Sequence, residues 1–282
     1  MTKQRGILGG RTAVVTGSTR GLGFAMARLL GQHGAAVVVA SRSGAHVSAA
    51  VDQLAAEGIT VSGRCCDTGE MADVAALRDE ALALGTLDIW VNNAGAPGVY
   101  GPTASTPVQD FTQVVRTNIL GTFHGSRVAL PVFRAQEHGD LVNVYGRGDQ
   151  GPVALQNAYA SSKRWVRQFT ETLRVETKGT GVRVHGMNPG LVVTDMVRHI
   201  RSQPGYEQRL GALQVVVGLW GQTPEAAARP LLDLVTSDAA EFRDLTKATM
   251  AARGLRSVLA GRLRRANRMP LDTASLDQDP AD

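Results

Sequence analysis

The chain has 282 residues, of which 43% are hydrophobic, so it can bury the core of one large domain. Its net charge of +5 is local, because the segment from Arg243 to Arg268 holds eight basic residues and one acidic residue. This argues against nucleic-acid binding by the rest of the chain. No apolar run approaches the roughly 18 residues that cross a bilayer, and the adjacent Cys65 and Cys66 lack metal-ligand spacing. We therefore expect a cytoplasmic protein with no transmembrane segment, disulfide framework or metal site.

Short β-branched runs alternate along the chain with longer segments of helical periodicity. The predicted strands cover residues 12–16, 36–40, 60–65, 87–91, 140–144 and 181–187. The predicted helices cover residues 22–33, 45–57, 73–84, 107–133 and 158–178. Continuously apolar strands that alternate with helices are typical of a parallel sheet covered on both faces. The sequence therefore predicts an α/β fold, a Rossmann-like doubly wound parallel β-sheet in a single domain.

Two regions lie outside this alternating pattern. Residues from about 196 to 221 have no clear place in the sheet, and we expect them to form a mobile lid within a domain of residues 1–242. Residues 243–282 are predicted to form a basic helical extension and an acidic, disordered tail. This extension either docks on the domain, contacts an acidic partner or lies on a membrane surface. Its apolar residues at helical spacing are Leu255, Val258, Leu259 and Leu263.

A glycine-rich segment, Thr16 to Gly23, joins the first predicted strand directly to the first helix. At that junction the lack of Cβ atoms lets a pyrophosphate approach backbone N–H groups and the positive end of the helix dipole. The segment therefore predicts a dinucleotide site. The residues predicted to contact the cofactor are Gly17, Ser18, Thr19, Arg20, Gly21, Leu22 and Gly23.

The end of the second predicted strand indicates which dinucleotide binds. NAD-specific folds place an acidic residue there, which binds the ribose hydroxyls and repels a 2′-phosphate. Here that position is Ser41, followed by Arg42. Arg42 and Arg20 are both placed to pair with a phosphate dianion. We therefore predict NADP(H) as the cofactor, with Ser41 and Arg42 beside its adenosine ribose.

Tyr159 and Lys163 are four residues apart and so share one face of a predicted helix. A phenol is a poor base near neutral pH, because its ordinary pKa is about 10. A neighbouring ammonium stabilises the phenolate and is expected to lower that pKa. The pair therefore predicts proton transfer to or from a carbonyl or alcohol oxygen, with Tyr159 as the general acid or base.

These motifs together resemble the short-chain dehydrogenase/reductase family. The resemblance covers roughly residues 10–200 and rests on the Gly-x-x-x-Gly-x-Gly spacing of the first loop, Asn92-Asn93-Ala94-Gly95, Tyr159-x-x-x-Lys163 and Asn188-Pro189-Gly190. It implies that Tyr159 and Lys163 also contact the cofactor, and that Asn118 anchors a water in a proton relay. Further cofactor contacts that it implies come from Asp67, Asn93, Ala94, Gly95, Pro189, Gly190 and Thr194.

The sequence departs from the family thirteen positions before Tyr159, where the family has a serine that polarises the substrate carbonyl. Gly146 stands there instead, and losing one donor to a developing oxyanion typically costs about 10²-fold in rate. Either Tyr145, Arg147 or Asp149 replaces that donor, or the substrate needs none. We also expect the missing side chain to leave room for a bulkier substrate.

A narrower resemblance is to the chlorophyll(ide) b reductase branch of the family. It rests on residues 90–95 and 115–121, the glycine-rich run in place of the serine, segments 244–247 and 261–268, which resemble the basic C-terminus of that branch, and the absence of a final strand ending in Asp-Gly-Gly. Enzymes of that branch reduce a formyl group on a large flat macrocycle with NADPH. The resemblance therefore implies reduction of an aldehyde or ketone.

The leading hypothesis is an NADPH-dependent oxidoreductase that reduces the carbonyl of a bulky small-molecule substrate by hydride transfer. The alternatives are a non-redox isomerase, dehydratase or cyclase on the same scaffold, and an NADP(H)-binding regulator without turnover. The intact Asn118, Tyr159 and Lys163 favour an enzyme, because a regulator needs no proton relay. The resemblance also implies a homodimer or homotetramer through the helices of Asn118 and Tyr159, and the missing final strand counts against the tetramer.

Overall fold

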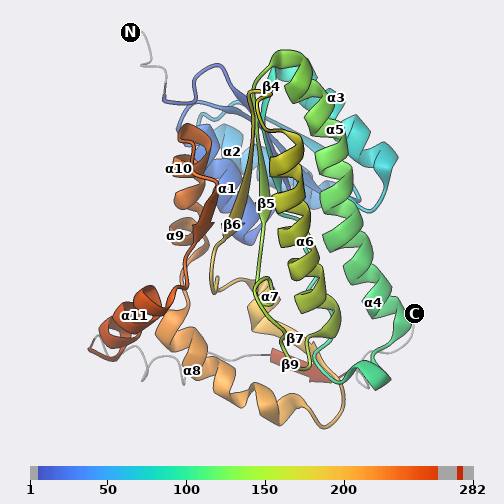
Figure 1. Ribbon diagram of the computed structural model, residues 1–282, viewed down its shortest axis with the longest axis vertical. Helices are drawn as coiled ribbons and strands as arrows, with labels where there is room; N and C mark the ends of the chain where they lie inside the picture. Colours follow the sequence, from blue (N-terminus) through green and yellow to red (C-terminus); the bar gives the residue numbers. More distant parts are fainter. Residues whose placement is uncertain (1–5, 260–271, 276–282) are drawn as a thin grey trace.

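The computed structural model describes residues 6–259 and 272–275, which form a parallel sheet between two layers of helices (Figure 1). The seven strands lie in the order β3-β2-β1-β4-β5-β6-β8, and all neighbours are parallel. The strand order reverses between β1 and β4, where open α/β sheets form their ligand crevice. The strands are β1 (Thr12–Thr16), β2 (Ala36–Ser41), β3 (Val61–Cys65), β4 (Leu87–Asn92), β5 (Gly139–Val144), β6 (Val182–Asn188) and β8 (Glu241–Arg243).

The predicted helices are all present, so the Rossmann-like class is confirmed. The segment predicted as one helix over 107–133 is α4 (Val108–Val114), a π-helical segment (Val115–Leu120) and α5 (Gly121–Gln136). The other helices of the two layers are α1 (Gly21–Gln32), α2 (Gly44–Ala56), α3 (Met71–Leu84), α6 (Asn157–Glu176), α9 (Pro224–Ala228) and α10 (Pro230–Thr236).

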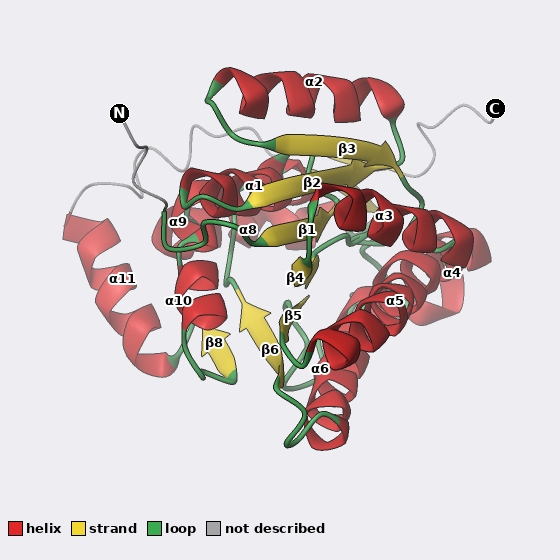
Figure 2. Ribbon diagram, turned by 90° about the horizontal axis from the view of Figure 1, so that it is seen from above, coloured by secondary structure: helices red, strands yellow, loops and turns green. Residues whose placement is uncertain are grey.

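Alternate residues of each central strand face opposite helical layers. In β2, Val37 and Val39 pack with α1, α2 and α10, whereas Val38 and Ala40 pack with α3 and α5. Figure 2 shows α3, α5 and α6 on one side of the sheet and α1, α9 and α10 on the other. Burial on both faces explains why the strands are continuously apolar rather than alternating.

The prediction that the final strand is missing is wrong. Glu241–Arg243 forms β8, whose Phe242 is paired with Met187 of β6 and packs against the core. The strand has only three residues and a charged residue at each end, so its sequence carries little of the usual β-strand pattern. It also ends one residue beyond the predicted domain boundary at residue 242.

The predicted lid has its own secondary structure beyond the carboxyl ends of the strands. It contains α7 (Asp195–Arg198), β7 (His199–Ser202) and α8 (Gly211–Trp220) (Figure 1). The tail is predicted to be disordered, which is wrong for residues 272–275: they form β9 (Asp272–Ser275), parallel to β7. The basic segment 261–268 and the remaining tail residues lie outside the described part of the chain.

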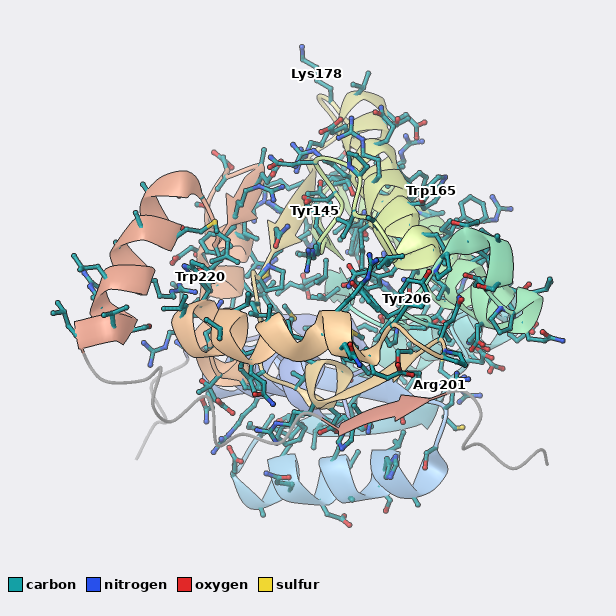
Figure 3. The ribbon with its side chains drawn as sticks, turned by 90° about the horizontal axis from the view of Figure 1, so that it is seen from below. Tyr145, Trp165, Lys178, Arg201, Tyr206 and Trp220 are labelled. Carbon is teal, nitrogen blue, oxygen red and sulfur yellow. The ribbon has the colours of Figure 1, made fainter. Side chains whose placement is uncertain are left out.

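The predicted C-terminal helix, α11 (Lys247–Leu259), docks on α8. Trp220 Nε1 donates to Met250 O at 2.9 Å, and Ser257 Oγ donates to Leu219 O at 2.9 Å. In a view toward the carboxyl edge of the sheet, α8 crosses the front of the molecule and Trp220 lies where it meets α11 (Figure 3). Within residues 6–259 and 272–275, none of the helices is both long enough and apolar enough to span a bilayer.

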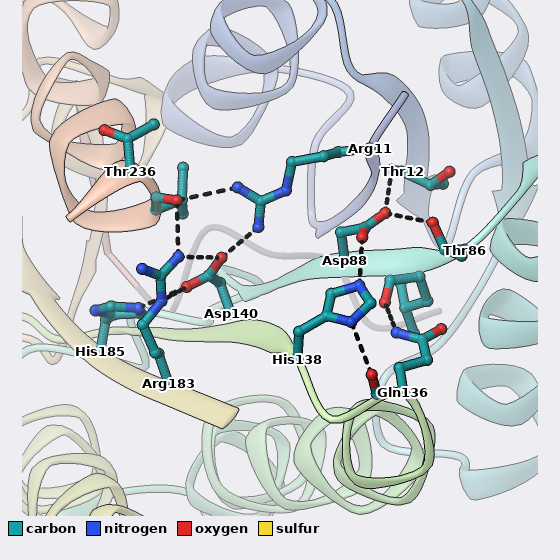
Figure 4. Close-up of polar contacts among 12 residues, drawn as sticks. Arg11, Thr12, Thr86, Asp88, Gln136, His138, Asp140, Arg183, His185 and Thr236 are labelled. Carbon is teal, nitrogen blue, oxygen red and sulfur yellow. Dashed lines mark hydrogen bonds and ion pairs between the residues drawn. The ribbon is translucent and has the colours of Figure 1, made fainter. Parts of the chain in front are cut away.

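The opposite, amino edge of the sheet is fixed by buried ion pairs (Figure 4). Asp140 is 1% exposed and contacts Arg11, Arg183 Nε at 2.7 Å and His185 Nε2 at 3.0 Å. Burial alone would raise the pKa of Asp140, but hydrogen bonds from these three residues lower it below its ordinary value. A cavity of about 840 Å³ lies at this edge, and its arginines are engaged with protein acceptors.

Candidate active site

The junction of β1 and α1 forms a backbone cradle of the kind that binds an anion. Gly17 and Gly21 have positive φ angles of 63° and 55°, and a Cβ atom on Gly23 would lie 2.3 Å from Gly17 O. Among the described residues none caps the N-terminus of α1 with its side chain, and its first turn holds no acidic residue. Its N–H groups are therefore free to donate to a phosphate. The residues present fit a dinucleotide pyrophosphate.

Ser18 differs from the prediction that it binds the cofactor. Its hydroxyl donates to Val15 O at 2.5 Å and accepts from Ala40 N at 2.9 Å, and its own backbone N–H donates to Ala40 O at 3.0 Å. The side chain is fully buried. Ser18 therefore links β1 to β2 by hydrogen bonds and stabilises the glycine-rich loop that follows β1.

The Asn92-Asn93-Ala94-Gly95 loop packs directly against the glycine loop. Asn93 Nδ2 donates to Thr16 O at 2.9 Å and to Gly17 O at 3.2 Å, while the backbone N–H of Ala94 donates to Thr16 Oγ1 at 3.0 Å. Asn92 Nδ2 donates to Asn143 Oδ1 at 2.9 Å across paired positions of β4 and β5. The loop thus lies against the glycine loop and ties the central strands together.

The two arginines predicted to bind a 2′-phosphate are placed differently. Arg42 is exposed beyond the end of β2, and no ion-pair partner for it occurs within the described ranges. Arg20 Nη1 instead contacts Asp195 Oδ2 at 3.2 Å, at the start of α7. Arg42 is therefore the better placed of the two, since Arg20 must leave Asp195 to reach a phosphate.

Two further residues that are predicted to contact the cofactor lie at or just beyond the ends of neighbouring strands of the sheet. Ser41 is half-buried, and its hydroxyl donates to Ser43 O at 3.3 Å. Asp67 follows β3, where its Oδ1 accepts from Gly69 N at 2.9 Å. Both stand at carboxyl ends of strands, as the sequence predicts.

The Asn188-Pro189-Gly190 turn begins at the last residue of β6, at the carboxyl edge of the sheet. Gly190 has a φ angle of 72°, and its N–H donates to Asn188 Oδ1 at 3.0 Å. A Cβ atom on Gly21 would lie 3.1 Å from Thr194 Cγ2. Thr194 therefore lies against the glycine loop, and the turn faces the same crevice.

Lys163 and Tyr159 lie at this crevice on α6. Lys163 Nζ is buried, donates to Val144 O at 3.0 Å and lies 5.7 Å from the centroid of the Tyr159 ring. A Cβ atom on Gly95 would lie 3.8 Å from the same Nζ atom. The structure therefore brings the predicted pair together with the loop that follows β4.

Burial sets the pKa values of this pair. It lowers the pKa of Lys163 to about 8 and, with a smaller contribution from Asp149, raises the pKa of Tyr159 to about 12. The prediction of a lowered pKa for Tyr159 is wrong for this structure. The reason is that desolvation of the buried phenolate is the largest effect on this pKa.

Asn118 lies in the π-helical segment and is buried. Its Oδ1 accepts from Ala96 N at 2.8 Å, and its Nδ2 donates to Ser162 Oγ at 2.9 Å. Ser162 Oγ in turn donates to Tyr159 O at 2.7 Å. Single-turn π segments are frequent at functional sites. Asn118 thus joins the β4 loop to the helix of Tyr159, while the water of the proton relay stays a prediction.

The space beside Gly146 is filled by Tyr159. A Cβ atom on Gly146 would lie 2.5 Å from Tyr159 Oη and 3.3 Å from Lys163 Cε. The expectation that the missing side chain leaves room for a substrate is therefore wrong, because the phenol occupies that volume.

The three residues predicted as replacements for the missing hydroxyl donor differ in burial and in contacts. Tyr145 is buried beneath Arg167, whose guanidinium carbon lies 5.6 Å from the ring centroid. Arg147 is exposed. Asp149 is buried and accepts from Asn188 Nδ2 at 3.2 Å.

Sequence reasoning missed several residues that support the site, because each acts through a contact between distant segments. Asp244 is an example: its N–H donates to Asn188 O at 3.0 Å, and its carboxylate binds Arg253 and Gln222. Asp244 directly follows β8, so recognising that strand in the sequence would have identified Asp244 as a residue of the site. The other missed residues are Asn143, Ser162, Thr170 and Gln222.

A glycine-rich cradle at the switch point of a doubly wound sheet, with a tyrosine and a lysine beside it, is where such folds bind a dinucleotide. A family profile described as short chain dehydrogenase matches residues 11–205. The chain belongs to the short chain dehydrogenase family, and the predicted family is confirmed.

Individual relatives come from more than one branch. The chain is 36% identical over 209 residues to the probable chlorophyll(ide) b reductase NYC1, chloroplastic, of Oryza sativa subsp. japonica, which covers 67% of this chain and 42% of that relative. It is 35% identical over 195 residues to the monensin polyketide synthase putative ketoacyl reductase of Streptomyces virginiae, covering 68% of this chain and 74% of that relative. The chain thus matches less than half the length of the rice relative. The predicted resemblance to chlorophyll(ide) b reductases is confirmed. Ketoacyl reductases are similar to this chain at about the same identity.

Two solved structures are similar in fold to this chain over most of its length. The gluconate 5-dehydrogenase of Burkholderia cenocepacia J2315, in complex with NADP and tartrate, has a TM-score of 0.75 at 25% identity, covering 86% of this chain and 96% of that one. A single-residue variant of the actinorhodin polyketide ketoreductase with NADPH has a TM-score of 0.72 at 25% identity, covering 94% of this chain and 95% of that one.

Proposed function

We propose that this chain is an NADPH-dependent carbonyl reductase in which Tyr159 protonates the carbonyl oxygen. The observation that carries the proposal is the placement of Lys163 beside Gly95, on the loop that holds the glycine cradle, with the Tyr159 ring centroid 5.7 Å from Lys163 Nζ. This puts a proton donor at the same crevice as the turn of Gly190. The reductase and NADP descriptions of the relatives support the same reaction and cofactor.

NADPH, when bound, supplies the hydride. Tyr159 supplies the proton: with a pKa of about 12 its phenol is fully protonated near neutral pH, which suits reduction better than oxidation. Lys163 places a positive charge beside the phenol and balances the charge that it leaves behind. Asn118, through Ser162, fixes the backbone carbonyl of Tyr159 and so the position of the phenol.

Arg42 accounts for the preference for NADPH over NADH. It is exposed at the adenosine end of the groove, where an acidic residue would repel a 2′-phosphate. A guanidinium there binds a phosphate dianion through charge-assisted hydrogen bonds.

The rim of the site favours a large apolar substrate. Helix α8 crosses the carboxyl edge and has one polar side chain, Gln214, between Gly211 and Trp220. Val215 on this helix is 40% exposed. An apolar helix with exposed side chains beside an active site is a suitable wall for an apolar ligand. We therefore propose a bulky aldehyde or ketone as the substrate class.

The reductase is proposed to act as a cytoplasmic homodimer. Exposed Phe123 on α5 lies 6.3 Å from Phe169, which stacks on Trp165 of α6 at 4.7 Å between ring centroids. Trp165 lies on the outer side of α6 (Figure 3). Trp165 and Phe169 are half-buried, and an aromatic cluster with an exposed member across two neighbouring helices is typical of an interface. Light scattering of the protein and of Phe123→Asp tests this: the mass should halve in the variant.

A spectrophotometric assay tests the reaction. The protein is mixed with NADPH and a panel of aromatic aldehydes, polycyclic ketones and short aliphatic aldehydes, and absorbance of the reduced nicotinamide is followed. We expect oxidation of NADPH that is faster with the bulky members. Tight NADPH binding without oxidation by any carbonyl would contradict the proposal and favour a non-redox enzyme or a regulator on this scaffold.

A further inference from the structure

Asp149 is a buried carboxylate next to the reacting groups, and the proposed mechanism does not yet use it. It is 3% exposed and lies in the loop between β5 and α6, ten residues before Tyr159. A buried charge is costly unless it is paired and hydrogen-bonded. Its partners therefore show what it holds in place.

The backbone of Asp149 closes a turn against α6. Its N–H donates to Gly146 O at 3.2 Å, and its carbonyl accepts from Arg164 Nη1 at 3.0 Å. Within this turn Gly148 has a φ angle of 101°, and a Cβ atom there would lie 2.5 Å from Ala160 Cα. Only glycine allows this close approach. The turn is pressed onto the helix beside Tyr159, whose hydroxyl faces Gly146.

The side chain of Asp149 connects this turn to two other parts of the site. It accepts from Asn188 Nδ2 at 3.2 Å, and Asn188 Oδ1 accepts from Gly190 N at 3.0 Å. It also binds the guanidinium of Arg243 in β8, with Nη1 at 3.3 Å, and lies 3.6 Å from Arg167 Nη1. One carboxylate thus joins the turn of Gly146, the turn of Gly190 and the edge strand.

Asp149 also contributes a negative charge to the site. It raises the pKa of Tyr159 and the pKa of Lys163, in both cases as a smaller effect than burial. The charged residues around Asp149 come from α6 and β8 and are Lys163, Arg164, Arg167, Glu241 and Arg243.

We propose that Asp149 is a positioning residue for carbonyl reduction: held by Arg243, it fixes the Gly146–Asp149 turn against Tyr159. This rests on the proposed function. Asp149 acts through the placement of Tyr159 and transfers no proton itself.

Glu241 offers a matched control. It accepts from Arg167 Nη1 at 2.8 Å and from Arg243 Nη2 at 3.3 Å, so it shares both arginines with Asp149. Its carboxylate belongs to β8 and binds these arginines, while the turn of Gly146 is held by Asp149. If activity depended only on the ion pairs with these two arginines, Asp149→Asn and Glu241→Gln would therefore lower it equally.

The test compares Asp149→Asn, Glu241→Gln and the double variant Asp149→Asn/Arg243→Gln with the parent protein. The double variant removes both charges of the pair, so it remains informative if Arg243, left with Glu241 as its acidic partner, prevents Asp149→Asn from folding. Three quantities are measured: kcat against pH, the Kd for NADPH from its fluorescence, and the titration midpoint of Tyr159. The midpoint comes from NMR of ring-labelled tyrosine, assigned by Tyr159→Phe among four tyrosines.

Both Asp149 variants should lose about 10²-fold in kcat, since a small misplacement of a reacting group has that effect. Their midpoint for Tyr159 should move to lower pH, with an unchanged Kd for NADPH, and Glu241→Gln should match the parent protein. An unchanged kcat and midpoint in the Asp149 variants, or an equal shift in Glu241→Gln, would overturn the proposal. The NMR midpoint needs no turnover, so it decides the role of Asp149 even if the parent protein reduces no carbonyl.

Discussion

The hydroxyl of Tyr159 occupies the volume into which a side chain at residue 146 would extend, since a Cβ atom on Gly146 would lie 2.5 Å from Tyr159 Oη. The glycine is therefore a packing requirement of this site. It lets the phenol approach the backbone of the β5–α6 loop, and Lys163 Cε and Cγ line the same space at 3.3 Å.

Replacing Gly146 by serine should lower activity, although it supplies the hydroxyl that the family usually has. The added Cβ atom must displace Tyr159, and we expect a loss of about 10²-fold in kcat for Gly146→Ser and Gly146→Ala alike. Gly151 in the same loop is the control, because no described atom lies within 4 Å of a Cβ atom there. A faster Gly146→Ser enzyme would contradict the assigned packing.

Carbonyl reduction should decline as the pH rises through about 8. The pKa of Lys163 is lowered to about 8 by burial, so the ammonium is present below that pH and is lost above it. Tyr159 stays protonated throughout, with a pKa of about 12. The pH profile of kcat/KM, which reports groups of the free enzyme, measures this. Lys163→Arg keeps the charge and should remove the decline; a profile that is flat through pH 8 in the parent protein would be inconsistent with the assignment.

Replacing Arg42 by alanine should weaken NADPH binding by about 10-fold to 10²-fold, because it removes a charge-assisted hydrogen bond to the 2′-phosphate. NADH lacks that phosphate, so its binding should be unchanged. Arg28→Ala is the control, because Arg28 is another exposed arginine but pairs with Glu57 at 2.6 Å. Calorimetry with both cofactors measures the preference. Equal NADPH affinity in the parent protein and Arg42→Ala would show that another group binds the 2′-phosphate.

The Asp140 cluster should make the fold sensitive to acid. The pKa of Asp140 is lower in the folded protein than its ordinary value of 3.8, so its stabilisation is present above that value and is lost as the pH falls through the folded-state pKa. Asp140→Asn leaves half-buried Arg183 without its buried carboxylate partner and should lower the free energy of unfolding by about 3 kcal/mol. Urea unfolding measures this, with the exposed Asp238, 3.5 Å from Arg183, as the control. Equal effects of Asp140→Asn and Asp238→Asn would contradict the role of burial.

Local patterns predicted much of the fold and of the site. The strands and helices around β1, β2 and α1 follow from apolar runs and glycine positions, and the Tyr159–Lys163 pair follows from a four-residue helical spacing. β8 could not be predicted, because three residues with charged ends are stabilised by pairing with β6 rather than by their own pattern.

The errors at the site have a common physical cause. Ser18 reads as a loop residue, but its hydroxyl completes hydrogen bonds between β1 and β2. The pKa of Tyr159 and the role of Asp149 depend on burial among α6, β6 and the more distant β8. The spacing of residues in a sequence identifies neighbours on one helix or strand. Desolvation and ion pairing depend instead on how all the helices and strands pack together.

The central claim is that Tyr159 donates the proton in carbonyl reduction. Tyr159→Phe removes only the hydroxyl, so the most direct measurement is the rate of NADPH oxidation by the parent protein, Tyr159→Phe and Tyr206→Phe with the best aldehyde of the panel, alongside the Kd for NADPH. We predict that Tyr159→Phe loses about 10²-fold to 10⁴-fold in rate with an unchanged Kd, and that Tyr206→Phe keeps the parent rate. A Tyr159→Phe enzyme that oxidises NADPH at the parent rate would contradict the account.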